Sequence, residues 1–246
     1  MRAAYKIHAS GVVLLAVLLL VGCVGRPVRQ APPATAPAPV SEPTGAQTPA
    51  GREFRVDSAA SLLTIRVYKG GALSRAGHNH VIASHALTGV AYVPEDPTHA
   101  SFDIHLPVND LTVDEDALRA QEEGADFPAG VPEDAKAGTK KNMLGAALLE
   151  GDRYPEIVLQ SEALQRGAQG LDEELQAQVR VIVRDRATSV IVPIRYEIHG
   201  DDLQVEGEVP LKQTDLGLTP FSLFGGALRV LDDIKVRFKV VAHAAG

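Results

Sequence analysis

The side chains best suited to ligand or metal binding lie in a short histidine-rich segment, Gly77-His78-Asn79-His80-Val81. Imidazoles are the commonest metal ligands, and His78 and His80 lie on the same side of the chain if this segment is extended. A zinc site needs three or four protein ligands, however, so two histidines do not complete one. Three roles stay open. They are a metal site at His78 and His80, a headgroup-binding role for His78, Asn79 and His80 at a cavity mouth, and a structural role. We expect no bound metal.

Motifs typical of catalysis or nucleotide binding are missing from the sequence. It contains no Gly-x-Ser-x-Gly elbow and no Gly-x-x-x-x-Gly-Lys-Ser/Thr loop. The acidic run Asp114-Glu115-Asp116 lacks the spacing of a calcium loop, so we interpret it as a solvated charged segment. The sequence therefore predicts a protein that is not an enzyme and has no resident cofactor.

Composition excludes a nucleic-acid partner. There are 24 Lys and Arg residues against 31 Asp and Glu residues, the formal net charge is -7, and 4% of the residues are aromatic. Nucleic-acid binding needs a basic surface, and single strands also need aromatic stacking platforms. With 45% hydrophobic and 22% charged residues, the chain is typical of a globular protein instead.

The only cysteine, Cys23, follows an apolar stretch over residues 11–21, which is too short to span a bilayer. The end of this stretch, Leu20-Val21-Gly22-Cys23, resembles the lipobox at which bacterial lipoproteins are acylated and cleaved. Residue 24 is Val rather than the Asp that would favour retention in the inner membrane. We therefore predict a signal peptide over residues 1–22 and lipidation of Cys23. The predicted location is the bacterial periplasm, with the lipid anchor in the outer membrane.

A linker is predicted to connect this anchor to the folded part. Residues 24–52 hold seven of the sixteen prolines among Ala, Thr, Gly and Gln, with few large apolar side chains. Such a segment cannot bury enough surface to offset its ordering entropy. We assign residues 23–52 to the acylated cysteine and linker, and residues 53–246 to one domain.

Alternation with period two dominates this domain and predicts about eight β-strands, each with one buried face. Short polar turns join neighbouring strands, which favours an all-β, eight-stranded antiparallel barrel over an open sandwich. A barrel of this size either is filled by its own side chains or holds one small ligand. The predicted cavity-facing residues are Leu63, Ile65, Val67, Phe102, Ile104, Leu106, Val181, Val183, Val192, Ile194, Tyr196 and Phe238.

Two short helices are expected where the alternation stops. Residues 117–123 are compatible with one helical turn inside an otherwise irregular acidic insertion. Residues 141–149 place Met143, Leu144, Ala147 and Leu148 on one helical face. The second helix would either plug one end of the barrel or pack on its outside.

Several stretches together resemble one known family. They are Phe54-Arg55-Val56-Asp57, Leu63-Thr64-Ile65-Arg66-Val67, Tyr154-Pro155-Glu156-Ile157, Thr214-Asp215-Leu216-Gly217-Leu218 and Ile234-Lys235-Val236-Arg237-Phe238. In their order and spacing they are similar to the YceI family of periplasmic proteins. The resemblance implies a lipocalin-like barrel whose long cavity binds a polyisoprenoid chain, such as an isoprenoid quinone or a polyprenyl lipid. The lipid anchor, the linker and the histidine-rich segment depart from the commonest members.

The sequence thus supports a lipid-anchored periplasmic protein that binds an isoprenoid lipid for carriage, storage or sensing. Its partners would be that lipid and the membrane that holds the acylated Cys23. Two alternatives stay open, namely a tethered interaction module with a filled core and a histidine-based metal binder.

Overall fold

The structure is a computed structural model, and it describes residues 50–122, 124–167 and 174–246. The predicted signal peptide, Cys23 and most of the predicted linker lie outside the described residues. Within the described ranges, no helix is both long enough and apolar enough to cross a membrane.

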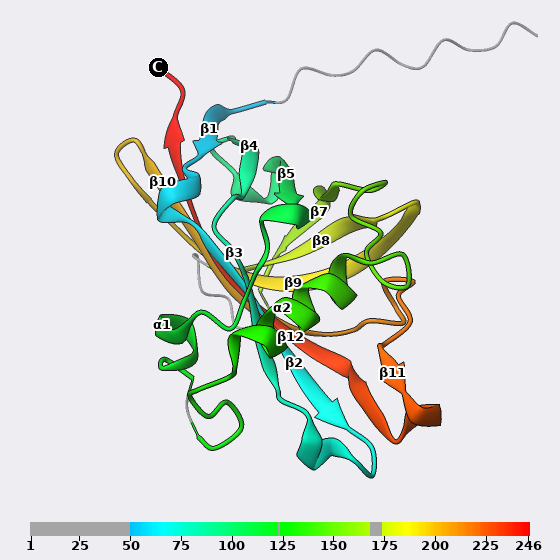
Figure 1. Cartoon of the computed structure of the whole chain (residues 1–246). Coiled ribbons are helices and arrows are strands. Elements are labelled where there is room, and N and C mark those ends of the chain that lie inside the picture. Colours follow the sequence, from blue (N-terminus) through cyan, green and yellow to red (C-terminus); the bar gives the residue numbers. More distant parts are fainter. Residues whose placement is uncertain (1–49, 123, 168–173) are drawn as a thin grey trace, which may run out of the picture. The chain divides into compact units, whose positions relative to one another are not determined.

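β-Strands make up most of the domain (Figure 1). In chain order the strands are β1 (Arg52–Val56), β2 (Leu62–Gly70), β3 (His80–Ser84), β4 (Thr88–Val93), β5 (Ser101–Pro107), β6 (Thr112–Val113), β7 (Glu156–Arg166), β8 (Glu174–Val183), β9 (Arg186–His199), β10 (Asp202–Lys212), β11 (Ser222–Leu223) and β12 (Leu228–Ala244).

Antiparallel pairing closes these strands into a barrel. The order around the ring is β1-β4-β5-β7-β8-β9-β10-β12, and pairing of β1 with β12 completes it. β1 and β2 pair with successive parts of the long β12. On their other edges, β1 pairs with β4 and β2 pairs with β3. The predicted eight-stranded antiparallel barrel is confirmed, and closure of the ring removes the open sandwich as a competitor.

Local sequence explains the meander. The β8–β9 and β9–β10 connections each leave two residues between strands, and Arg184 and Gly200 adopt φ values of 59° and 61° there. Positive φ at such turns matches the right-handed twist of the flanking strands. Register shifts lie at Ser161/Ala163 in β7 and Val230/Ile234 in β12. Extra residues of this kind bend a strand, which helps the sheet to close.

The helices differ in part from the predicted ones. α1 (Asp116–Arg119) lies within the predicted acidic insertion, but α2 spans Glu133–Leu144, so the helix predicted over residues 141–149 was wrong in its bounds. α2 starts after Pro132, carries two acidic residues in its first turn and ends at the extended Gly145. The short 3-10 helices are η1 (Ser58–Ala60), η2 (Ser74–Ala76), η3 (Pro97–His99), η4 (Val108–Asp110) and η5 (Phe224–Gly226).

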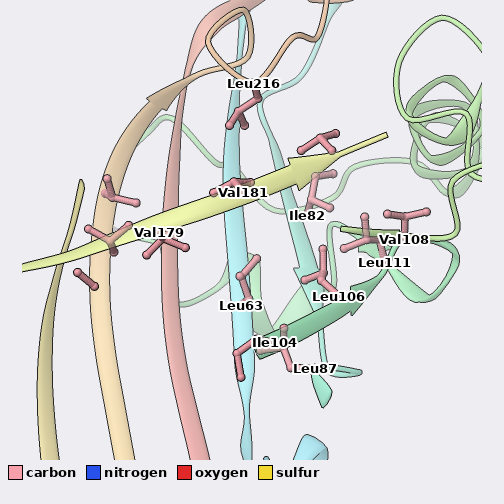
Figure 2. Packing of buried hydrophobic residues seen from close by; sticks show 14 of the residues in the cluster. Leu63, Ile82, Leu87, Ile104, Leu106, Val108, Leu111, Val179, Val181 and Leu216 are labelled. Atoms are coloured by element: carbon pink, nitrogen blue, oxygen red, sulfur yellow. The ribbon is translucent and has the colours of Figure 1, made fainter. Parts of the chain in front are cut away.

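The core lies on the inner faces of the barrel and extends past one side of it. Figure 2 shows Leu63, Ile104, Val179 and Val181 directed toward a common interior. Because side chains of a strand alternate between its faces, every second residue of β8 is buried, from Leu175 to Val183. This alternation places a continuous apolar wall around the interior.

Candidate functional site

The barrel encloses an apolar cavity of about 240 Å³. Its wall comes from the inward faces of the ring strands, from β2 and from a few residues outside the strands, such as Leu87 and Leu216. Among the described residues that line it, only Ser101 and Tyr196 carry side-chain hydroxyl groups. A space with such a wall binds apolar groups by burial, since each methylene removed from water contributes roughly 0.8 kcal/mol.

The structure places most of the predicted cavity-facing residues in this wall. The ones that line the cavity are Leu63, Ile65, Phe102, Ile104, Leu106, Val181, Val183, Val192, Ile194, Tyr196 and Phe238. Val67 instead packs against the hydrophobic core without contributing to the lining. Their role as lipid contacts stays a prediction.

Other wall residues were not among the predicted ones. Leu216 lies in the loop after β10, and Pro97 and Ala100 belong to or follow η3, where no alternation exists to indicate an inward direction. Ala177 is small, yet it is fully buried on the inward face of β8. Leu175, Ala177 and Val179 share one face of β8 and alternate with Gln176 and Gln178, and this alternation is the signal that could have found Ala177.

The histidine-rich segment belongs to a buried polar network. His80 Nδ1 lies 2.6 Å from Oδ2 of Asp114, and its Nε2 lies 3.3 Å from the Thr139 hydroxyl on α2. Arg119 Nη1 on α1 donates to Oδ1 of Asp114 at 2.6 Å and to the Asn79 carbonyl at 2.8 Å. The network thereby connects the start of β3 with both helices.

Asp114 is the centre of this network and is fully buried, so its interpretation as a solvated residue was wrong. Burial by itself raises the pKa of Asp114, but hydrogen bonds from His80, the Val81 amide and Arg119 outweigh it and hold the pKa below the usual value. Its φ of 53° is unusual for a residue other than Gly, although Asp and Asn tolerate it best. The acidic run Asp114-Glu115-Asp116 does not indicate from its sequence that Asp114 is buried.

The three candidate headgroup residues have separate surroundings. His78 is exposed, whereas the Asn79 amide is buried, accepting from Lys69 N and donating to the Asp126 carbonyl. The His78 and His80 rings lie 6.2 Å apart. None of the three is among the described residues that line the cavity, and in the described part of the chain no three metal-ligating side chains gather. Their headgroup role stays a prediction.

We expect the two histidines to respond differently to replacement by alanine. His80→Ala leaves the buried Asp114 carboxylate without one hydrogen-bond partner, which should lower the free energy of unfolding by about 1 to 3 kcal/mol. His78→Ala removes an exposed side chain and should change stability by less than about 0.5 kcal/mol. Urea unfolding of both variants measures the difference, and equal losses would contradict the assignment of His80 to the network.

Closure of the ring and the apolar interior define the class of protein: a small antiparallel barrel built around a ligand-sized space. The model of the YceI-like domain matches residues 54–242, and the chain belongs to this family. The match runs from β1 to β12 and so includes the whole ring.

A solved structure, that of BcnA, agrees on the fold. BcnA from Burkholderia cenocepacia is 16% identical with a TM-score of 0.52, and the match covers 76% of this chain and 98% of BcnA. A polyisoprenoid-binding domain from Saccharophagus degradans is 12% identical with a TM-score of 0.49, and coverage is 78% of this chain and 98% of that domain. Comparison with curated proteins found no significant match.

Proposed function

We propose that the chain is a lipid-anchored periplasmic protein that holds an isoprenoid-type lipid, either a polyprenyl lipid or an isoprenoid quinone, in the barrel cavity. The apolar cavity is the observation that carries this proposal. Membership of the YceI-like family supports it, because the fold places that cavity along the barrel interior. Binding, rather than catalysis, is the activity that such a wall favours, and it would serve carriage, storage or sensing.

The size of the cavity favours a slender occupant. Pockets for drug-sized ligands usually measure about 300 to 1,000 Å³, and this cavity, at about 240 Å³, is just below that range. A flexible prenyl chain is narrow and wholly apolar, so it suits a slender space with such a wall. A polar ring would find only the hydroxyl groups of Ser101 and Tyr196 as side-chain partners there, and burial of the remaining polar groups without partners is unfavourable.

The experiment is binding of the C20 alcohol geranylgeraniol to the full chain, followed by native mass spectrometry. We expect one molecule bound per chain, with octanoic acid, a shorter and charged apolar molecule, binding at least tenfold more weakly. The absence of saturable geranylgeraniol binding would contradict the proposed function.

The anchor is tested separately by Cys23→Ser. Acylation needs the thiol of Cys23, the single cysteine of the chain, so the variant should lose its acyl mass and its partition into the membrane fraction. Two or more acyl chains hold a protein firmly, and the expected loss is therefore nearly complete. Fractionation of expressing bacterial cells measures it, and a variant that still sediments with membranes would show that Cys23 is not the anchor.

A further inference from the structure

The barrel wall is interrupted between β9 and β10. Their ladder runs from the pair Asp202–His199 to the pair Glu206–Arg195. Beyond it, in the described parts of both strands, β9 pairs only with β8 and β10 pairs only with β12. We call the interrupted part, residues 190–194 of β9 and 207–211 of β10, the window. At its far end the Thr188 hydroxyl donates to the Asp215 carbonyl at 3.0 Å, which closes the gap.

Two prolines explain why pairing stops here. If the register continued past Glu206–Arg195, Glu208 would face Pro193 and Pro210 would face Ile191. Neither proline has an N–H to donate, so the ladder cannot extend through these positions. The Pro193 carbonyl lies only 2.5 Å from where a Cβ on Gly207 would be, so this edge of β9 faces β10. The positions of Pro193 and Pro210 in the sequence therefore account for the interruption of the ladder.

An outer groove of about 800 Å³ lies at the same place. Its wall includes Pro193 and Gly207, on the two edges of the window. Leu175, Ile194 and Phe238 line this groove and also line the inner cavity. At the window the cavity and the surface are thus separated by one layer of side chains, and Gly207 contributes no side chain to that layer.

The charged residues of the groove neutralise one another. Three cations and three carboxylates line it, and each cation lies beside a carboxylate. The pairs are Arg195–Glu174 at 2.9 Å, Arg237–Glu208 at 2.9 Å and Lys239–Glu206 at 3.6 Å. An anionic headgroup would have to compete with these carboxylates, whereas an uncharged polar headgroup finds both donors and acceptors.

We propose that the window is the route by which the prenyl chain enters and leaves the cavity, and that an uncharged polar headgroup, an alcohol or a quinone, stays in the outer groove. The proposal rests on the proposed function and adds the route and the headgroup class. Opening the route requires the Ile194 and Phe238 side chains to move and the touching backbones at Pro193 and Gly207 to separate. It breaks no hydrogen bond of the β9–β10 ladder, because that ladder has already ended. Entry between any two paired strands would have to break several such bonds.

The test compares two exposed isoleucines of β9. Ile191, 55% exposed, lies within the window, and Ile198, 40% exposed, lies outside it, next to the β9–β10 turn. Each is changed to Cys in a full chain that carries Cys23→Ser, and the unique thiol is coupled to a polyethylene glycol maleimide. Exchange of bound geranylgeraniol for its deuterated form is then followed by native mass spectrometry.

We expect the label on Ile191→Cys to slow exchange at least tenfold, with a change of less than twofold for the label on Ile198→Cys. Equal exchange rates in the two labelled variants would overturn the window as the route. Slower exchange with the Ile198→Cys label alone would also overturn it, because that result indicates entry through the end of the barrel. A chain that binds no geranylgeraniol before labelling contradicts the proposed function itself, so the two failures are distinguishable.

The headgroup class is tested with the same unlabelled chain. Geranylgeraniol should bind at least tenfold more tightly than geranylgeranyl monophosphate, because the chain is identical and only the headgroup charge differs. Equal or tighter binding of the phosphate would overturn the uncharged headgroup while leaving the window to the exchange experiment.

Discussion

Asp114→Asn is expected to lower the free energy of unfolding by about 3 to 5 kcal/mol, the effect of removing one partner of a buried ion pair. The variant leaves the Arg119 guanidinium, whose side chain is 1% exposed, without its carboxylate. Asparagine tolerates the positive φ of this position as well as aspartate does, so the loss reports on charge rather than on backbone strain. Urea unfolding at neutral pH measures it.

The pH dependence of the same pair has a definite sign. Because the pKa of Asp114 is lower in the folded chain than in the unfolded one, its contribution is complete above the unfolded pKa of about 3.9. It disappears as the pH falls through the lower folded pKa. As the pH falls from about 5 to about 2, the free energy of unfolding of the wild type should therefore decrease more than that of Asp114→Asn does.

Asp116→Asn is the matched control. It changes the same residue type two positions away, but the Asp116 side chain is 85% exposed and pairs with Lys136 at 3.1 Å. We expect a loss of less than about 1 kcal/mol, as for other surface ion pairs. If Asp114→Asn were as mild as Asp116→Asn, the buried network would not hold α1 and β3 together as described.

Ala177→Phe is expected to weaken geranylgeraniol binding at least tenfold. Ala177 is fully buried on the inward face of β8 and lines the cavity, so the added ring occupies space that the prenyl chain would fill. Tenfold corresponds to about 1.4 kcal/mol, less than the burial of two methylenes. Native mass spectrometry gives the affinity and urea unfolding of the lipid-free chain gives the stability.

Gln178→Phe provides the control for Ala177→Phe, because the neighbouring residue of β8 faces away from the cavity. It should leave geranylgeraniol binding unchanged within twofold. Overpacking a filled core destabilises by about 1 to 3 kcal/mol, whereas an empty cavity accommodates the ring with a smaller loss. Destabilised Ala177→Phe protein in a chain that never binds lipid would favour the tethered module with a filled core.

The strands and the cavity wall could be predicted because alternation encodes them directly. Ile104, for example, lies between the polar residues Asp103 and His105, and it faces inward as expected. Val67 follows the same pattern on β2, but it packs against the hydrophobic core without lining the cavity. Period alone gives the face of a strand and not how far the cavity reaches along it.

The helix and the polar network could not be predicted from local patterns. α2 carries mostly polar residues, so its sequence lacks the apolar stripe that indicates an amphipathic helix. Asp114 is buried through partners at His80 and Arg119, and the distance in sequence between Asp114 and His80 hides their pairing. Likewise the window depends on a register that brings Pro193 opposite Glu208, which no single strand reveals.

The central claim, that the cavity holds an isoprenoid lipid, is tested most directly by the contents of the protein from its own host. The full chain is purified under mild conditions, its bound lipids are extracted, and native mass spectrometry before extraction gives the stoichiometry. We expect about one prenyl lipid with an uncharged headgroup per chain, and its loss in Ala177→Phe but not in Gln178→Phe. Protein that carries no prenyl lipid from the host and does not bind geranylgeraniol afterwards would contradict the account.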